Sequence, residues 1–425
     1  MNYFKSKTTE SYAIFFVGAA IFMQRISMGA GNVLYGFAIL FFLISLYIQY
    51  KKHTLKDNFV VKKVLQYWKI LGIAILLILP SVFISAHLGK SFKTMLEIWL
   101  YRALPLFIIP LCTKNKKSMY WLLGAVFISL NLDSLLTFFQ HIYLKNPRPS
   151  GFSNNPLNLA AILAMTIPVQ VIIMAETVFP MGLRKLAIVS IFTNILGLFG
   201  GQSRGSWLLL AFTPFFSFKY WLKNKYFPIA CLIIAAIIGG FIVSSPSMQN
   251  RIISTTNMTT DRSNADRLVV WESASMMIHD YPLLGVGPGE FTEIYKAHYE
   301  LPENTQHMVH THNNFIQVTT ESGVLGLLAF LILFGFIEIR ALRDTFKGNP
   351  YAYMRLAATT FYLLFGLIDY TFDASAIMKL YWFYIAISLS LEALAENDTS
   401  VKSNETTENI QAKSVETDNT SSEKA

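Results

Sequence analysis

Histidines are concentrated in one hydrophilic stretch of this otherwise apolar chain. Five of the eight lie between residues 246 and 314, namely His279, His298, His307, His310 and His312. The last two belong to the run His310-Thr311-His312-Asn313-Asn314, directly before a long apolar segment. A histidine at the end of a membrane helix suits general-base chemistry, because its ordinary pKa is close to physiological pH. Either histidine could be that base. A metal site is the competing interpretation, but no cysteine or nearby acidic residue completes a ligand set, so we expect no metal.

Arg204 lies in the short turn 200–207 between two apolar runs. Its planar fork of donors suits phosphate oxygens, and the small residues around it leave room for a ligand. An arginine that reaches toward water, with Trp207 as an interfacial anchor, explains the same residues equally well.

The segment 262–280 has apolar residues at helical spacing, with Arg267 beside the apolar face. The glycines of 285–289 follow it, and we expect them merely to turn the chain. Gly323 and Gly326 lie in the next apolar run, where they allow another helix or a lipid chain to approach closely.

Charged residues also occur inside or beside the apolar runs. Such groups are costly in a membrane and are candidates for function, but a satisfied ion pair within the bundle is the simpler expectation. Five residues is a poor helical spacing for the pair Glu97 and Arg102. The charged residues concerned are Glu97, Arg102, Asp133, Glu176 and Asp369.

The composition indicates that the chain is in contact with membrane lipid as well as with water. The 425 residues are 53% hydrophobic and 14% charged, whereas soluble domains carry about 25% charged residues. The net charge of +9 does not indicate nucleic-acid binding, because the basic residues lie in short loops between apolar runs. Both cysteines lie within apolar runs and predict neither a disulfide framework nor a zinc site.

The apolar runs predict an all-α polytopic membrane protein with about twelve transmembrane helices. The predicted spans are 11–24, 32–50, 69–86, 95–111, 119–140, 157–178, 185–200, 206–218, 227–245, 315–337, 354–370 and 376–394.

Lysine and arginine predict the orientation. One set of loops holds twenty of these residues and the other set's short loops hold seven, so the first set and both termini are expected in the cytoplasm. The chain then divides into nine helices in 1–245, a large helical outward loop in 246–314, and three helices in 315–395. The polar tail, 396–425, is expected to be disordered in the cytoplasm.

Together these segments resemble the O-antigen ligase family. Its signature is a histidine followed by Asn, Ser or Gln, then nine residues, then Gly-x-x-Gly, which here is His312-Asn313 and Gly323-Val324-Leu325-Gly326. The segments 150–156, 203–207 and 267–291 agree in order and position. The motif-bearing stretch covers about residues 150–330.

The resemblance implies a metal-independent, inverting glycosyltransferase of the bacterial inner membrane, with a periplasmic active site and no cofactor. It would move O-antigen from undecaprenyl diphosphate to a hydroxyl of a lipid A-core sugar in lipopolysaccharide biosynthesis, in contact with membrane lipids. By this similarity His312 is the general base and Arg204 and Arg267 hold the donor diphosphate. Asn313, Gly323 and Gly326 support the motif.

Three alternatives remain open on sequence. An O-antigen polymerase uses the same donor with another lipid-linked glycan as acceptor, and a protein O-oligosaccharyltransferase shares much of the motif. A transporter or flippase would also have twelve spans and buried charges, but it has no need of the histidine-rich loop.

Overall fold

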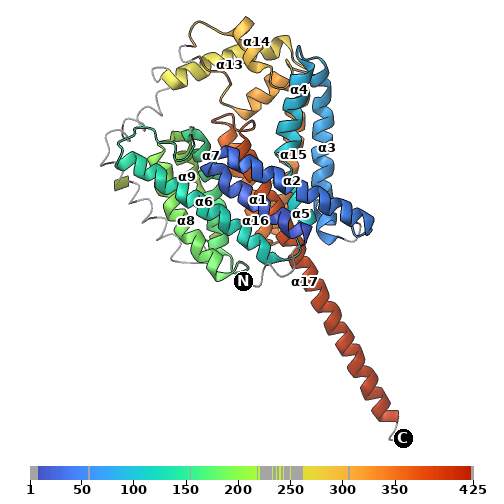
Figure 1. Cartoon of the computed structure of the whole chain (residues 1–425). Helices are drawn as coiled ribbons and strands as arrows, with labels where there is room; N and C mark the ends of the chain where they lie inside the picture. The colour runs from blue at the N-terminus through green and yellow to red at the C-terminus, as the bar shows by residue number, and fades with distance from the viewer. Residues whose placement is uncertain are drawn as a thin grey trace.

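The chain folds as a bundle of helices (Figure 1). The computed structural model describes residues 8–55, 58–153, 155–217, 219–220, 262–304 and 307–422, with a few single positions between 232 and 249. In these residues all regular structure is helical, including two π-helical turns labelled η. The elements are α1 (Thr9–Ile26), α2 (Met28–Lys51), α3 (Phe59–Phe83), α4 (Leu88–Met95), η2 (Leu96–Tyr101), α5 (Pro105–Cys112), α6 (Lys116–Ile142), α7 (Pro156–Ala175), α8 (Met181–Gly200), α9 (Arg204–Phe216), α13 (Arg262–Asp280), α14 (Phe291–Ile294), η3 (Tyr295–Tyr299), α15 (Asn314–Phe346), α16 (Pro350–Gly366) and α17 (Ser375–Ser422).

Short polar signals in the sequence begin several of these helices. Asn155 caps α7 and accepts a hydrogen bond from the Leu157 amide at 2.9 Å, and Pro156 occupies the first helical position. The pair Asn349 and Pro350 begins α16 in the same way. Asparagine satisfies a free amide of the first turn and proline has a suitable φ there, so both starts are encoded locally.

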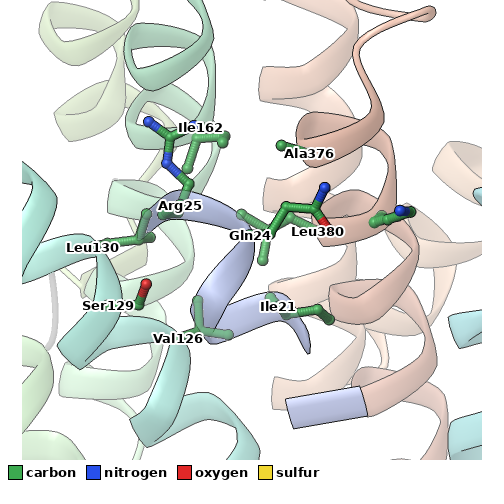
Figure 2. Close-up of a pocket in the computed structure, with 10 residues that line it drawn as sticks. Ile21, Gln24, Arg25, Val126, Ser129, Leu130, Ile162, Ala376 and Leu380 are labelled. Atoms are coloured by element: carbon green, nitrogen blue, oxygen red, sulfur yellow. The ribbon is translucent and has the colours of Figure 1, made fainter. Parts of the chain in front are cut away.

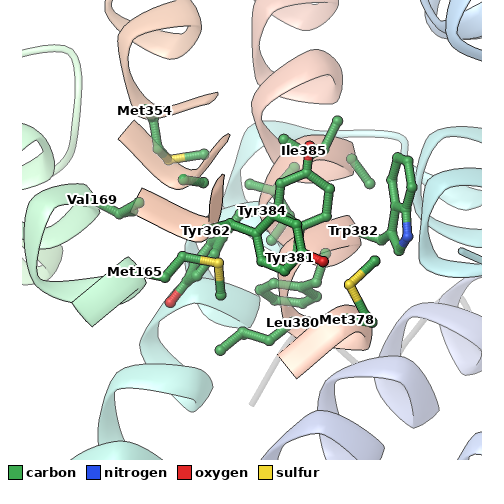
Figure 3. Close-up of a cluster of buried hydrophobic side chains, with 14 of the residues drawn as sticks. Met165, Val169, Met354, Tyr362, Met378, Leu380, Tyr381, Trp382, Tyr384 and Ile385 are labelled. Carbon is green, nitrogen blue, oxygen red and sulfur yellow. The ribbon is translucent and has the colours of Figure 1, made fainter. Parts of the chain in front are cut away.

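Helix α17 passes through the centre of the bundle. It packs on α16, α5 and α3, while α15 packs between α3 and α16. Figure 3 shows the aromatic cluster at this centre, in which Tyr381, Trp382 and Tyr384 of α17 lie close to Tyr362 of α16 and Met165 of α7. These three aromatic side chains are at most 1% exposed, so this part of α17 is a core helix.

The outside of the bundle is apolar. Helix α2 exposes large apolar side chains along its length, and most of it is not buried by other helices. A surface of this kind requires lipid, which agrees with the composition. The exposed apolar residues of α2 are Met28, Val33, Phe37, Leu40, Leu43 and Ile44.

Eight helices among the described residues are long and apolar enough to cross a membrane. The predicted spans 11–24, 354–370 and 206–218 are also helical, as α1, α16 and α9, but these helices are shorter or more polar. The predicted span 227–245 lies almost entirely outside the described residues. The all-helical membrane fold is therefore confirmed, and the total of twelve spans stays a prediction. The eight are α2, α3, the run Leu88–Cys112, α6, α7, α8, α15 and the part of α17 up to Ser400.

The charges that the sequence places in the apolar runs are paired. Arg102 Nη2 lies 3.2 Å from Glu97 Oε1, although the two residues are five positions apart. The reason is η2, because a π-helix bonds residue i to i+5 and so aligns residues five apart. The other pairs are Arg25 Nε with Asp133 Oδ2 at 2.8 Å, Lys219 Nζ with Glu176 Oε1 at 2.8 Å, and His312 Nδ1 with Asp369 Oδ1 at 2.7 Å.

The described part of the predicted loop 246–314 is a small helical unit, which we call the α13 subdomain (residues 262–304 and 307–311). It has a core of its own made of Val270, Ala274, Met277, Val286, Phe291 and Tyr295. Figure 1 shows α13 and α14 at one end of the bundle, with the end of α17 projecting from the other.

The tail contains the polar part of α17, and its disorder in the cytoplasm stays a prediction. The composition from residue 396 predicts disorder, whereas α17 continues as one helix to Ser422. The buried half of α17 provides the nucleus from which the polar half extends, since propagation of a helix is far easier than its initiation.

Candidate functional site

His312 lies at the junction between the α13 subdomain and α15. Asn313 is the cap of α15 and accepts hydrogen bonds from the amides of Phe315 at 2.9 Å and Ile316 at 3.1 Å. The Asn313 amide group also donates to the Leu367 carbonyl at 3.2 Å. The motif residue Asn313 therefore begins the helix and ties it to the α16–α17 connection, which fixes the backbone beside His312.

The α16–α17 connection supplies an acid to His312. Asp369 Oδ1 lies 2.7 Å from His312 Nδ1, and the Tyr370 amide donates to the same oxygen at 2.9 Å. The two side chains are 15% and 9% exposed. A carboxylate on Nδ1 keeps the proton there and leaves Nε2 with a free lone pair. The pair can thus accept a proton from a substrate hydroxyl.

Asn314 holds these two segments together. Its carbonyl accepts from the amides of Thr371 at 2.7 Å and Phe372 at 3.0 Å, and its amide donates to the Tyr362 hydroxyl at 3.3 Å. A side chain at Gly366 would meet the Asn314 amide nitrogen at 2.4 Å. Sequence reasoning missed this role, although Asn314 directly follows the motif pair.

The His310 ring lies against the His312 ring, with 4.0 Å between the ring centroids and an angle of 52° between their planes. The His312 amide donates to His310 Nδ1 at 3.3 Å, which leaves the proton of a neutral ring on Nε2. Burial, together with the charges of His312 and Arg267, lowers the pKa of His310 to about 4. With Nδ1 accepting this bond and Nε2 carrying the proton, a neutral His310 has no free lone pair for a substrate proton. It is therefore a poor general base near pH 7.

Both predicted arginines lie near the segments that carry His312 and Asp369. The positive charge of Arg267 contributes to the lowered pKa of His310. One turn along α13, Trp271 Nε1 donates to the Thr311 carbonyl at 2.7 Å. Arg204 is the first residue of α9. A side chain at the next position, Gly205, would meet Ile368 at 2.7 Å, so this helix end lies against the connection that carries Asp369.

The motif glycines join α15 to the α13 subdomain. Gly323 has φ 61° and ψ −161°, which interrupts α15. The segment after α13 enters this break, where the Gly287 amide donates to the Glu321 carbonyl at 2.8 Å and the Val324 amide donates to the Pro282 carbonyl at 2.9 Å. A side chain at Gly285 would meet the Glu321 backbone at 2.4 Å. The expectation that 285–289 merely turns the chain is therefore incomplete, because these glycines also allow backbone to lie against backbone.

A cation could also be held here. Ligand atoms of His310, His312 and Asp369 all lie within 4.8 Å of one another. The sequence offered only two ligands, since Asp369 is far away along the chain and reaches them through the fold. A base with its positioning acid and a three-ligand metal site thus share the same residues, and a chelator distinguishes them.

The small cavity in Figure 2 lies between α1, α6 and α17, with Gln24 and Arg25 beside Ser129 and Leu130. Its volume is about 10 Å³, which is room for about one water molecule. It is too small for a sugar or a diphosphate.

Comparison with known proteins agrees with the sequence motif. Residues 189–331 match the family model described as O-Antigen ligase. A protein of Rickettsia conorii named as a polysaccharide ligase is 26% identical over 159 residues, which are 36% of this chain and 37% of that protein. Another of that name from Rickettsia bellii is 28% identical over 156 residues, 33% of this chain and 36% of its own. The matches thus span little more than a third of each curated relative, and they support a ligase-type role. The resemblance predicted from the motif is confirmed, since the region that carries Arg204, Arg267 and His312 matches the O-antigen ligase family model.

Proposed function

We propose that this protein transfers a glycan from a polyprenyl diphosphate to a hydroxyl of a lipid-linked acceptor, as an O-antigen ligase in lipopolysaccharide biosynthesis. The observation that carries the proposal is the hydrogen bond between His312 and Asp369 within the family's motif region. Its donor is undecaprenyl-diphosphate-linked O-antigen, and its acceptor is a sugar of the lipid A-core.

In the proposed reaction His312 Nε2 takes the proton of the acceptor hydroxyl as the oxygen attacks the anomeric carbon. The bond between that carbon and the diphosphate oxygen breaks, and the diphosphate leaves with the electron pair. Attack from the opposite side inverts the anomeric centre. Asp369 is a positioning residue that holds His312 in the tautomer able to accept a proton.

The leaving group requires cations rather than a second base. A diphosphate is already a good leaving group when its charge is stabilised. We assign this to Arg204 and Arg267, whose forks suit phosphate oxygens. The N-terminus of α9, where Arg204 stands, adds the positive end of a helix dipole.

The proposed location is the bacterial inner membrane. The excess of lysine and arginine in one set of loops supports cytoplasmic termini and a periplasmic α13 subdomain. Donor and acceptor then meet His312 at the outer surface of that membrane.

The test is transfer by the purified protein from undecaprenyl-diphosphate-linked glycan to lipid A-core, with and without EDTA. We compare the wild type with His312→Ala and with His53→Ala, a substitution of an exposed histidine in the α2–α3 loop. The proposal requires transfer that survives EDTA, vanishes in His312→Ala and persists in His53→Ala.

Each other outcome has a definite meaning. Loss of transfer with EDTA and recovery with added metal would assign His310, His312 and Asp369 to a metal. Elongation of the lipid-linked donor without transfer to lipid A-core would identify a polymerase instead. Transfer that continues in His312→Ala would remove His312 as the base.

A further inference from the structure

The α13 subdomain carries a groove on its surface. The groove has a volume of about 640 Å³ and is open to solvent. We call it the α13 groove. Its walls are the last turns of α13, the π-turn η3 and the residues after it. The lining residues are Ser275, Met276, His279, Asp280, His298, Tyr299, Glu300 and Leu301.

The groove combines hydrogen-bonding side chains with apolar ones such as Met276 and Leu301. The Tyr299 hydroxyl donates to Asp280 Oδ2 at 2.6 Å, and His279 Nδ1 lies 3.3 Å from Asp280 Oδ1. These two contacts, the first being the stronger, lower the pKa of Asp280, while the bond to Asp280 raises the pKa of Tyr299 to about 12. The Asp280 carboxylate and the protonated phenol of Tyr299 therefore line the groove at neutral pH, together with the side chains of His279, His298 and Glu300.

This chemistry matches a neutral, hydroxyl-rich ligand. Two carboxylates, Asp280 and Glu300, and no lysine or arginine line the groove, so it repels phosphate groups. In the described part of the chain, the ligand sets compact enough for a metal ion lie elsewhere and contain none of these residues. Sugar hydroxyls both donate and accept hydrogen bonds, and the exposed ring of Tyr281 beside the groove offers an apolar face to a sugar ring.

Helix α13 links the groove to the candidate site. Arg267 and Trp271 lie toward the end of α13 that is near the candidate site. Trp271 donates a hydrogen bond to the carbonyl of Thr311, the residue before His312. His279 lies eight residues beyond Trp271, which is about 12 Å along a helix. The subdomain core fixes α13 against η3, so the groove keeps its position relative to Arg267. A donor with its diphosphate at Arg267 has α13 along which to extend its glycan.

We propose that the α13 groove binds the glycan chain of the lipid-linked donor, at sugars remote from the one bonded to the diphosphate. The assignment to the donor rests on the proposed function, whereas the binding of a glycan does not. The groove contributes affinity for long glycans and takes no part in the chemical step.

Binding is measured directly, without transfer. The probes are oligosaccharides of one to four repeats, released by mild acid from the surface polysaccharide of the bacterium that carries this protein. Isothermal titration compares the wild type with Asp280→Ala and His298→Ala, and with the control Glu303→Ala, an exposed carboxylate outside the groove. We expect each groove variant to weaken binding about tenfold and the control to leave it unchanged. His298 is exposed, so this variant should fold normally. Unchanged binding in both groove variants would overturn the proposal.

Transfer kinetics then assign the ligand. Both groove variants should raise KM about tenfold for a donor with several repeats and leave kcat unchanged, with no effect on a donor that carries one sugar. An equal rise in KM for the one-sugar donor would show a general disturbance and contradict the proposal. A rise in KM for lipid A-core alone would assign the groove to the acceptor and overturn the assignment to the donor. A further outcome is that the wild type and all variants bind oligosaccharide, with weaker binding in Asp280→Ala, and yet transfer nothing. That result would refute the proposed function and leave the glycan site standing.

Discussion

Replacement of Gly323 by alanine should destabilise the protein strongly, because two independent costs fall on one position. The backbone at Gly323 has φ 61° and ψ −161°, a region essentially restricted to glycine. An added Cβ would lie 2.2 Å from the carbonyl carbon of Leu283. That atom belongs to the backbone and cannot rotate away, so the two chains must separate.

The size of the effect follows from these two terms. The backbone conformation costs about 1–3 kcal/mol for a residue with a side chain. The steric overlap adds about 1–3 kcal/mol, as for overpacking in a protein interior. The sum of about 2–6 kcal/mol corresponds to a fall in melting temperature of the order of 5–10 °C. Transfer should also decrease, since the break at Gly323 anchors the segment that follows α13.

Gly335→Ala is the matched control, because Gly335 lies in the same helix and an added Cβ there meets no atom within 4 Å. Alanine is favoured over glycine by about 1 kcal/mol within a helix, so this variant should melt at or above the wild-type temperature. The assay is intrinsic-fluorescence melting of both variants in the same detergent. Equal melting temperatures for the two variants would refute the interlock between Gly323 and Leu283.

Three further substitutions test the site. Asp369→Asn should lower the transfer rate by about 10²–10⁴ at an unchanged melting temperature, because an amide that donates to His312 Nδ1 leaves Nε2 protonated; a rate within threefold of wild type would remove Asp369 from the reaction. His310→Gln should reduce the pH dependence of stability. The pKa of His310 is about 4 in the folded chain and 6.5 ordinarily, so the stability of the wild type should fall as the pH falls from about 6.5 to 4. The same dependence of melting temperature on pH in both proteins would contradict this. Gln317→Leu removes the acceptor of the Thr311 amide at 2.9 Å, at a cost of about 1–3 kcal/mol; melting equal to wild type would show that this bond is dispensable.

The sequence predicted most of the helices because lipid demands long apolar runs, and their length is visible without any tertiary information. It missed the break within 88–112, where η2 interrupts one predicted span. A π-turn leaves the apolar pattern unchanged and is maintained by packing, here by the contacts of Arg102 with Asp373 and the Phe372 carbonyl. Composition also gave no sign that α17 would continue beyond residue 395, since it does not report a helix that is nucleated upstream.

The candidate site was predicted in part. His312 and the motif glycines could be found because they lie within one short stretch of sequence. Asp369 was recognised only as a costly charge, since its partner is 57 residues away and the contact is made by tertiary structure. Asn314 gave no signal at all. Its four hydrogen bonds all reach residues of α16 or the α16–α17 connection, and no local pattern reports them.

The fixed gap in the motif has a structural cause. His312 and Gly323 are eleven residues apart, and the part of this interval from Asn314 to Gly323 forms the first two and a half turns of α15, about 14 Å long. The α13 subdomain contacts α15 at both ends of this interval, through the bond from the Thr311 amide to Gln317 Oε1 at one end and through the backbone of Pro282 and Leu283 at the other. Each added or deleted residue would rotate one contact by about 100° relative to the other, so the two could not form together. The spacing therefore fixes the orientation of α13, and with it the position of Arg267 beside His310.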